Sequence, residues 1–326
     1  MNSPEASPLE VRVAAKTLVA QDICTLDLVR ADGRPLPPAE PGAHIDLHLP
    51  SGRVRPYSLC QAPGEPRYRI GVLRDAASRG GSREVHDEVQ AGQTLRMGAP
   101  RQRFGLAPQA EQHLLLAAGI GITPLLSMAQ ALQAQGRRYT LHYAARSRAQ
   151  AAFLDLLGQP AFAPHTHLYL GDAGQRLDLA AVLSQPQPGT HVALCGPQRF
   201  IDAALACAQA AGWPSAQLHF ERFGAEAGTG PSDPAAGDQA FEVELARSGR
   251  VIPVAADQTI ARALAQAGME PLLSCEQGVC GTCLTPVLAG EPDHRDSYLT
   301  PEERAAGTQI LLCCSRARGG RLVLDL

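Results

Sequence analysis

Four cysteines near the carboxyl end constrain this chain more than any other feature. Cys275, Cys280 and Cys283 lie within nine residues, and Cys313 follows thirty residues after the third of them. Thiolates spaced C-x4-C-x2-C-x29-C can surround a two-iron, two-sulfur cluster, because one tight loop delivers three ligands and a distant segment delivers the fourth. The loop also holds two glycines, and a residue without Cβ lets the backbone fold closely around such a group. The sequence therefore predicts a 2Fe-2S centre on these four thiolates.

Two other uses of cysteine fit this pattern less well. A zinc site usually pairs two short knuckles, whereas here one knuckle holds three cysteines and the fourth arrives singly. A disulfide framework is typical of short secreted domains, not of a chain of 326 residues with nine cysteines. Cys313 and Cys314 are adjacent, and side chains alternate across a strand, so we expect only one of them to face the cluster. Cys313 keeps the ferredoxin-like spacing.

Length and charge bound what the rest of the chain can be. A mass of 34.4 kDa is enough for two or three domains with separate cores. The net charge of -3 and the absence of any run of five Lys or Arg exclude a broadly basic nucleic-acid surface. No uncharged apolar stretch reaches the length of a membrane span, and the amino terminus has no leader-like pattern. We expect a cytoplasmic monomer that binds neither nucleic acid nor membrane, in a compartment where thiols stay reduced.

Residues 1–108 are predicted to form an antiparallel β-barrel. Short segments of strand-forming residues alternate there with Gly/Pro clusters, which is typical of a small barrel. The predicted strands are residues 11–18, 23–29, 44–49, 53–60, 68–73 and 94–97. Two polar motifs stand out within this region: Arg55-Pro56-Tyr57-Ser58, and the turn Gly80-Gly81-Ser82 that opens a helical pattern. A glycine-rich turn at the start of a helix presents free N–H groups to a phosphate.

Residues 109–226 begin with a second phosphate-binding pattern. The run from Leu114 is typical of a buried parallel strand, turns on Gly119 and Gly121, and enters an amphipathic helix that runs to Gln135. Thr123-Pro124 stands where the ordinary dinucleotide fingerprint has its third glycine, a departure from the standard Rossmann pattern. Strands and helices then alternate, which predicts a parallel sheet wound with helices. The strands are residues 139–144, 167–170 and 191–195; the helices are residues 149–157, 179–183 and 200–211.

The last part of the chain divides into a linker and a small domain. Residues 227–240 are rich in Gly, Ala, Pro and Ser without periodicity, which indicates an interdomain tether. Residues 241–326 show two strands, a helix at residues 259–267, the cysteine loop, and strands at residues 309–313 and 321–326. This order suggests a β-grasp ferredoxin. His294, Arg295 and Asp296 are interpreted as a solvated loop rather than as metal ligands.

The complete order of motifs resembles the phthalate dioxygenase reductase family, within the ferredoxin reductase superfamily. The resemblance covers nearly the whole chain, including the tail Cys313-Cys-Ser-Arg-Ala. It implies a multidomain α+β protein with an FMN-binding β-barrel domain, an NAD(P)H-binding α/β parallel-sheet domain, and a plant-type 2Fe-2S ferredoxin domain. The ligand set implied for the cluster is Cys275, Cys280, Cys283 and Cys313.

The resemblance also implies roles for the polar motifs. Arg55 of the Arg55-Pro56-Tyr57-Ser58 motif would contact the flavin phosphate region, Tyr57 would pack on or near the isoalloxazine, and Ser58 would hydrogen-bond its polar edge. Gly80, Gly81 and Ser82 would cap the phosphate. In the nucleotide domain, Gly119, Gly121, Thr123 and Pro124 would form the pyrophosphate turn, and Cys195, in Cys195-Gly196-Pro197, would position the nicotinamide. Glu221 and Phe223 would return an acidic and an aromatic side chain to the flavin.

The choice of nucleotide stays open between two indications. Arg146 and Ser147 follow the second strand of the nucleotide domain, where an acid would select the ribose of NADH and a basic side chain accepts a 2'-phosphate. These residues favour NADPH, whereas the resemblance favours NADH, which we prefer. FMN is expected because the family binds it, and FAD stays open.

The implied function is electron transfer to a terminal Rieske oxygenase. A nicotinamide gives two electrons together and a 2Fe-2S cluster takes one at a time, so a flavin that handles either number must stand between them. We expect a reductase that carries electrons from NADH through FMN and the cluster to a separate oxygenase. The alternatives are a reductase for a cytochrome P450 or a diiron hydroxylase, and a binding protein that senses redox state through its cluster.

Overall fold

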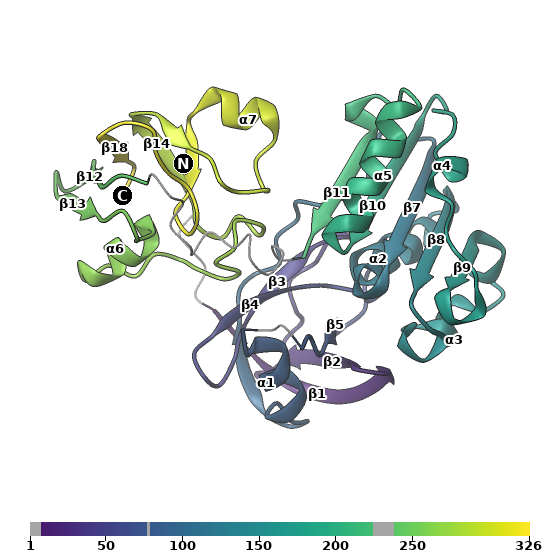
Figure 1. Ribbon diagram of the computed structural model, residues 1–326. Coiled ribbons are helices and arrows are strands. Elements are labelled where there is room, and N and C mark those ends of the chain that lie inside the picture. The colour runs from purple at the N-terminus through teal and green to yellow at the C-terminus, as the bar shows by residue number, and fades with distance from the viewer. Residues whose placement is uncertain (1–7, 77–78, 224–237) are drawn as a thin grey trace. The chain divides into compact units, whose positions relative to one another are not determined.

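The chain divides into two compact units in a computed structural model that describes residues 8–76, 79–223 and 238–326 (Figure 1). The first unit is Met1–Phe223 and the second is Gly224–Leu326. The first holds an antiparallel and a parallel sheet, and the second holds a mixed sheet around its own core. The predicted multidomain α+β fold is confirmed.

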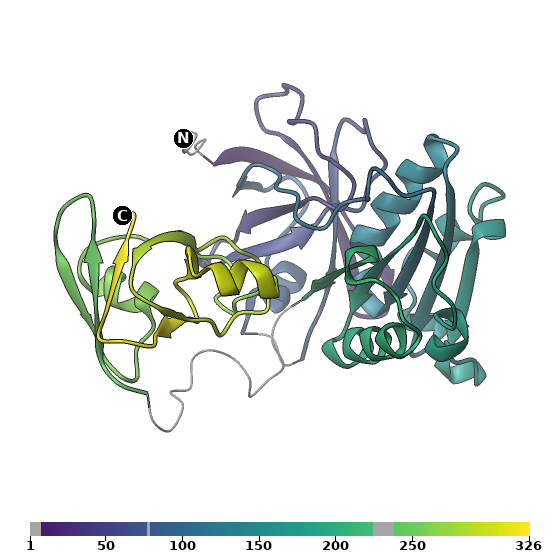
Figure 2. The ribbon, with the colours of Figure 1, turned by 90° about the horizontal axis from the view of Figure 1, so that it is seen from above.

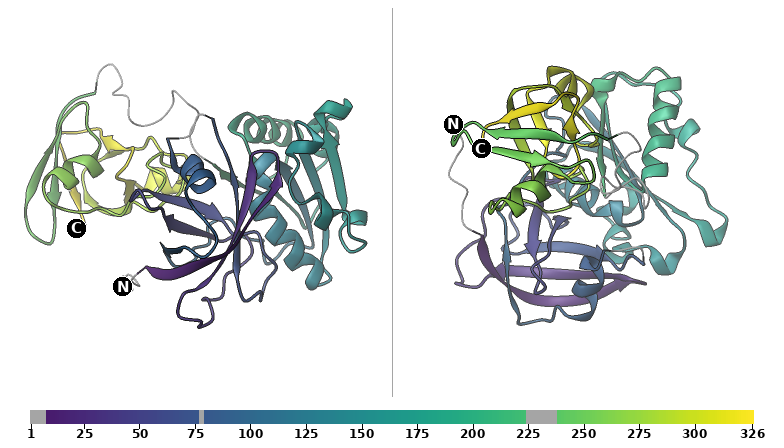
Figure 3. Two further views of the ribbon diagram at one scale, coloured as in Figure 1. Left: turned by 90° about the horizontal axis from the view of Figure 1, so that it is seen from below. Right: turned by 60° about the vertical axis from the view of Figure 1, so that its left-hand side comes forward.

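A six-stranded antiparallel sheet forms the amino-terminal part of the first unit. Its strands are β1 Leu9–Ala20, β2 Ile23–Arg30, β3 His44–His48, β4 Val54–Ser58, β5 Tyr68–Leu73 and β6 Thr94–Met97, in the order β4-β3-β6-β1-β2-β5. The sheet curls, with the long β1 shown in dark purple in Figure 3, until Leu59, just after β4, bridges to Ile70 of β5. Alternating apolar residues of these strands fill the interior, as a barrel requires.

A five-stranded parallel sheet follows, with helices on both of its faces (Figure 2). The strands are β7 Gln112–Ala118, β8 Arg138–Ala145, β9 Thr166–Leu170, β10 Thr190–Gly196 and β11 Leu218–Arg222, in the order β11-β10-β7-β8-β9. The helices are α2 Ile122–Ala134, α3 Leu154–Leu157, α4 Leu179–Val182 and α5 Gln198–Ala210. The predicted helix over residues 149–157 is shorter than expected, because Phe153 adopts φ +64° and only the last turn is α-helical.

Helix α2 differs from the amphipathic helix that the sequence predicts. Nearly all of its residues are buried, because one side packs on the parallel sheet and the other on the barrel. Ser127 Oγ accepts a hydrogen bond from the Gly42 N–H at 2.9 Å, and Gln130 Nε2 donates to the Cys60 carbonyl at 2.9 Å. The helix therefore joins the two sheets of the first unit into one body.

The second unit is a β-grasp built on a five-stranded sheet. Its elements are β12 Phe241–Leu245, β13 Val251–Val254, α6 Ile260–Gln266, β14 Leu284–Ala289, β15 Pro292–Asp293, α7 Pro301–Ala306, β16 Gln309–Leu311, β17 Arg316–Ala317 and β18 Arg321–Leu324. The main sheet has the order β13-β12-β18-β14-β16, with β12 parallel to β18. Strand β14 and helix α7 are not predicted from the sequence, although Thr300 and Glu303 form a capping box.

Most of the predicted linker over residues 227–240 lies outside the described residues. Its last part contacts the second unit: the Asp238 carboxylate pairs with the Arg295 guanidinium at 2.5 Å, and the Gln239 carbonyl accepts from Arg316 at 3.0 Å. In the described part of the chain, no helix combines the length and the apolarity that crossing a membrane requires.

Candidate functional site

The carboxyl ends of two parallel strands meet the end of a barrel strand in the first unit. Ser58, the last residue of β4, donates a hydrogen bond from Oγ to Oε2 of Glu221 at 3.2 Å, although 163 positions separate them. Glu221 lies on β11 in register with Cys195 on β10. The structure thus brings together three of the predicted site residues, and we call Ser58, Cys195 and Glu221 the junction.

Burial keeps the acidic groups of the junction protonated. Loss of water around the Glu221 carboxyl group raises its pKa to about 8, and the hydrogen bond from Ser58 only partly opposes this rise. Burial also raises the pKa of the Cys195 thiol well above its ordinary value, with the charge of Glu221 as a smaller cause. At neutral pH the Glu221 carboxyl group and the Cys195 thiol are therefore uncharged.

The turn after β7 packs directly against the junction. A Cβ on Gly121 would lie 2.3 Å from the carbonyl oxygen of Cys195, so only glycine lets the turn approach β10 this closely. Gly119 adopts φ +56°. Thr123 is buried and its hydroxyl donates to the Ile120 carbonyl at 3.0 Å, so this hydroxyl is used within the turn. The contact expected between Thr123 and a pyrophosphate stays a prediction.

The neighbouring residues on β10 and α2 shape the same edge of the sheet. A Cβ on Gly196 would lie 2.9 Å from the Ala118 Cβ, which again keeps β10 close to the end of β7. Pro197 precedes α5, and Pro124 lies in the first turn of α2, where a missing N–H costs no helical hydrogen bond. The predicted nucleotide-binding residues of this edge are thus adjacent in space.

A second turn lies beside two arginines on the barrel. Gly80 adopts φ +100° before the short helix α1 Gly81–Asp87. A Cβ on Gly81 would come within 2.8 Å of the Arg55 side chain, and one on Gly80 within 3.4 Å of the Arg53 guanidinium. The Glu84 carboxylate on α1 accepts from Arg53 at 3.3 Å. Arg53 was not among the predicted site residues, because one arginine in a strand pattern carries no sign of what it faces.

Three further predicted flavin-site residues differ in their surroundings. Pro56 lies on β4, which is an edge strand and tolerates a residue without N–H. Tyr57 packs against the barrel core, and burial raises its pKa. Ser82 Oγ accepts from the Asp75 N–H at 3.2 Å. Phe223, the last residue of the first unit, is 39% exposed, so it is available to cover a planar ring.

The loop after β8 holds the residues expected to choose the nucleotide. Ser147 Oγ accepts from the Gln150 N–H at 3.3 Å, which fixes the loop, while the Arg146 side chain is exposed. An acid is present nearby, but it follows β9: Asp172 Oδ2 accepts from the Arg148 N–H at 3.2 Å. The geometry therefore offers a basic and an acidic group at this edge.

In the second unit the four predicted ligand cysteines converge. Cys275, Cys283 and Cys313 are each 5% exposed, and Cys280 is half-buried. Hydrogen bonds from Cys280 and Cys313 lower the pKa of the Cys275 thiol, and one from Cys313 lowers the pKa of Cys283. These contacts join the four sulfur atoms into one connected group.

The loop geometry fits an anionic cluster. The Gln277 N–H points at Cys275 Sγ at 3.3 Å, and Cys280 Sγ lies 3.1 Å from the Thr282 hydroxyl, so donors already face the sulfur atoms. Within the described residues, no three His, Cys, Asp or Glu groups surround the position of a single ion.

Cys313 and Cys314 do not lie on a strand, contrary to the expectation. Strand β16 ends at Leu311, and both cysteines occupy the turn that follows, so the alternation argument does not separate them. Their contacts differ in part. Cys313 contacts Cys275, Cys283 and the neighbouring Cys314. Cys314 Sγ also lies 3.8 Å from the Leu311 carbonyl, 3.6 Å from Ser315 Oγ and beside Gly278 of the cysteine loop.

The loop over His294, Arg295 and Asp296 is not the solvated loop that was expected. The side chain of Asp296 is fully buried and that of His294 is 8% exposed; only Arg295 faces solvent. Three charged or polar residues in a row imply exposure by composition, but Asp296 is covered by the cysteine loop itself. Asp296 is the residue of this site that sequence reasoning missed.

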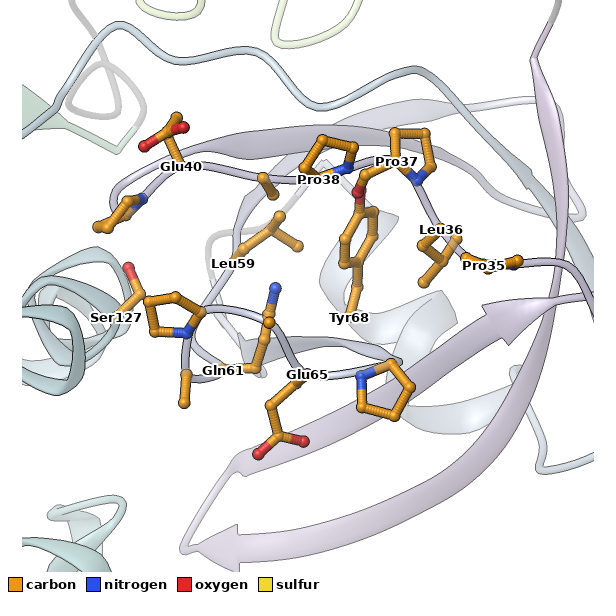
Figure 4. A pocket seen from close by; sticks show the side chains of 16 residues that line it. Pro35, Leu36, Pro37, Pro38, Glu40, Leu59, Gln61, Glu65, Tyr68 and Ser127 are labelled. Atoms are coloured by element: carbon orange, nitrogen blue, oxygen red, sulfur yellow. The ribbon is translucent and has the colours of Figure 1, made fainter. Parts of the chain in front are cut away.

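A pocket of about 400 Å³ lies elsewhere in the first unit (Figure 4). Proline-rich segments over residues 35–41 and 61–66 form its walls, and the Tyr68 hydroxyl donates to the Pro37 carbonyl. None of the predicted site residues lines it.

Comparison with known proteins places these features in a family. Residues 243–318 match the model of the 2Fe-2S iron-sulfur cluster binding domain, and residues 97–218 match that of the N-terminal domain of the dimethylamine monooxygenase subunit DmmA-like family. The chain is 47% identical over 321 residues to the vanillate O-demethylase oxidoreductase of Pseudomonas sp. (strain HR199 / DSM 7063), covering 98% of this chain and 100% of that one. The chain belongs to the phthalate dioxygenase reductase family.

Solved structures agree with this assignment. Phthalate dioxygenase reductase, described as a modular structure for electron transfer from pyridine nucleotides to [2Fe-2S], is 38% identical with a TM-score of 0.74, and each chain is covered to 98%. An intact type IV self-sufficient cytochrome P450 monooxygenase is 42% identical with a TM-score of 0.87; this chain is covered to 98% but spans only 41% of that longer protein. As a member of the family, the protein is an NAD(P)H-dependent flavin iron–sulfur oxidoreductase.

Proposed function

We propose that this protein is the reductase component of a Rieske-type oxygenase or demethylase, and that it passes electrons from NADH through FMN and a 2Fe-2S centre to that separate oxygenase. The observation that carries the proposal is the pairing of an uncharged junction in one unit with four convergent thiols in the other. A bound flavin accepts two electrons together from a nicotinamide and releases them singly to an iron–sulfur centre.

The junction residues orient the rings and keep water away from them. Ser58 and Glu221 hold each other by a hydrogen bond, and a carboxyl group with a pKa of about 8 stays protonated at neutral pH. Cys195 stays a neutral thiol for the same reason. An uncharged surface admits two stacked planar rings at contact distance, and this positioning is the main requirement of hydride transfer.

FMN is proposed over FAD because two guanidinium groups, those of Arg53 and Arg55, lie at the Gly80-Gly81 turn, where a terminal phosphate carries the most charge to neutralise. Mass spectrometry of the flavin released from the purified protein tests this directly: FMN is expected, and FAD would overturn it.

NADH is proposed from the family resemblance, although the exposed Arg146 favours NADPH. We expect kcat/KM for flavin reduction to be higher with NADH than with NADPH.

Electron transfer through the second unit is tested by removing one ligand. We expect NADH-dependent reduction of cytochrome c by the wild-type protein, and its loss in Cys280→Ser, because the one-electron exit is gone. Reduction of the bound flavin by NADH should persist, since all junction residues lie in the first unit. Slow reduction by NADH together with cluster-dependent binding to another protein would instead indicate a redox sensor.

A cytochrome P450 is the second candidate acceptor. The likeness to the reductase part of a self-sufficient P450 favours it, since that protein carries a matching module over 98% of this chain. Stopped-flow mixing of the NADH-reduced protein with a purified Rieske oxygenase and with a P450 separates the two: rapid reduction of the Rieske centre supports our proposal, and rapid reduction of haem supports the alternative.

A cytoplasmic location is proposed with this function, because none of the nine cysteines forms a disulfide.

A further inference from the structure

We propose that Asp296 is a positioning residue for the iron–sulfur centre: its buried carboxylate holds the cysteine loop in place and lowers the reduction potential of the cluster. The inference rests on the proposed use of Cys275, Cys280, Cys283 and Cys313 as ligands. It concerns residues of this chain alone and can be tested without any electron acceptor.

The segment around Asp296 lies directly against the cysteine loop. The Ser297 N–H donates to the Gly278 carbonyl at 3.0 Å, and a Cβ on Gly278 would lie 3.0 Å from Asp296 Cα. A Cβ on Gly281 would lie 2.0 Å from the Tyr298 ring. Both glycines of the loop adopt positive φ; Gly278 lies against Asp296 and Cys314 Sγ, and Gly281 lies against Tyr298. The backbone of the loop is therefore in close contact with the segment that carries Asp296.

The Asp296 carboxylate makes several hydrogen bonds although no part of its side chain is exposed. Oδ2 accepts from the N–H groups of Tyr298 at 3.0 Å and Leu299 at 2.8 Å. Oδ1 accepts from Ser315 Oγ at 3.5 Å, and that hydroxyl in turn accepts from the Arg295 N–H at 3.2 Å. Since Ser315 follows Cys313 by two residues, the carboxylate connects the segment that lies against the three-cysteine loop with the turn that carries the fourth cysteine.

Two cationic or titratable groups face this carboxylate. The Arg304 guanidinium lies 3.7 Å from Oδ2, is 38% exposed, and also donates to the Asp296 backbone carbonyl. The His294 ring lies 3.6 Å from Oδ1. A solvent-facing guanidinium only partly neutralises a buried anion. Reduction adds a negative charge to the cluster, and a fixed negative charge behind Gly278 opposes it, so Asp296 lowers the potential and Arg304 raises it.

The test is Asp296→Asn, with Asp293→Asn as matched control. Both changes remove one negative charge from the same loop, but the Asp293 side chain is 30% exposed and pairs with Arg295 at 2.8 Å. The midpoint potential is measured by anaerobic titration with dithionite, monitored by EPR. Loss of the cluster is followed optically in the presence of a chelator. We expect D296N to raise the midpoint potential. We also expect it to speed cluster loss about tenfold, because one hydrogen bond around the carboxyl group is weakened. D293N should change neither the potential nor the rate of cluster loss.

Arg304→Gln supplies a result of opposite sign. It should lower the potential, because it removes the positive charge beside the carboxylate and leaves the carboxylate in place. If the D296N variant is purified without bound iron, the R304Q variant alone tests the proposal. A midpoint potential below that of the wild type supports the proposal, and an unchanged or raised potential overturns it. Equal shifts in D296N and D293N, or faster cluster loss in D296N with no change of potential, would also overturn it. A failure to react with NADH would count against the proposed function only, since dithionite reduces the cluster directly.

Discussion

The junction in the first unit and the cysteine loop in the second are built in opposite ways. Ser58, Cys195 and Glu221 come from three strands of two sheets and meet only because α2 fixes those sheets together. Three of the four cluster cysteines come from nine consecutive residues. A site that stacks two rings depends on tertiary packing for its distances, whereas a metal loop carries its ligand spacing in the local chain.

The two sites also differ in the hydrogen-bond partners of their buried carboxyl groups. Glu221 has a hydroxyl as its hydrogen-bond partner, and burial raises its pKa to about 8. Asp296 has two backbone N–H donors, a hydroxyl and a guanidinium beside it. The two buried carboxyl groups therefore differ in the number of hydrogen-bond donors around them. The junction holds a neutral carboxyl group with one donor, and the carboxyl group behind the cluster loop has several.

The largest expected effect separates the two adjacent cysteines of the cluster turn. Cys313→Ser should abolish the visible absorption and EPR signal of the cluster, because Cys313 contacts Cys275 and Cys283. Cys314→Ser should retain both, since Cys313 keeps its contacts with Cys275 and Cys283 and the ferredoxin-like spacing in that variant. Iron content per chain and the visible spectrum are the measurements. Loss of the cluster in C314S with retention in C313S would reverse the assignment.

Glu221→Gln should lower the rate of flavin reduction by NADH about tenfold: the amide carbonyl still accepts from Ser58, but the NH2 group differs from the carboxyl O–H in donor direction and strength. Stopped-flow absorbance at the flavin band measures this rate. The cluster potential should not change, which keeps the two sites distinct. A normal rate in E221Q would show that the junction needs no carboxyl group.

The same variant has a distinctive pH dependence of stability. The folded protein holds the Glu221 proton up to about pH 8, while the unfolded chain releases it near 4.5. Wild-type stability therefore falls as pH rises through this window, by about 1.4 kcal/mol per pH unit relative to E221Q, and the difference levels off above it. Urea unfolding at several pH values measures it. Exposed Glu111, changed to Gln, is the control and should show no such trend.

The smallest effect distinguishes two glycines of the nucleotide turn. Gly121→Ala should destabilise the first unit by about 1–3 kcal/mol, because its Cβ would overlap the Cys195 carbonyl. Gly119→Ala meets no atom within 4 Å and should cost only about 1 kcal/mol, from its φ of +56°. Thermal unfolding compares them, and KM for the nucleotide should rise more in G121A. Equal stabilities would mean that β10 shifts freely.

Several features could be predicted from the sequence because they are local. The barrel strands are within two residues of their predicted bounds, since alternating burial and Gly/Pro turns are properties of short segments. The β-grasp order, the parallel sheet and the cysteine loop are confirmed as parts of the fold for the same reason. The family resemblance further identified Ser58, Cys195 and Glu221 as candidates, but not that a hydrogen bond would link two of them.

Only the tertiary structure shows which residues are covered by a part of the chain that is distant in sequence. The pattern of α2 reveals the face on the sheet, but the barrel buries its other face through contacts such as Ser127 with Gly42. Asp296 lies in a polar sequence that predicts exposure, yet Gly278 and its neighbours cover it. The local composition of a segment predicts its average exposure to water. It does not predict which distant segment will pack against it. The sequence by itself therefore determined the elements and the ligand loop, and packing decided the junction and the charge behind the cluster.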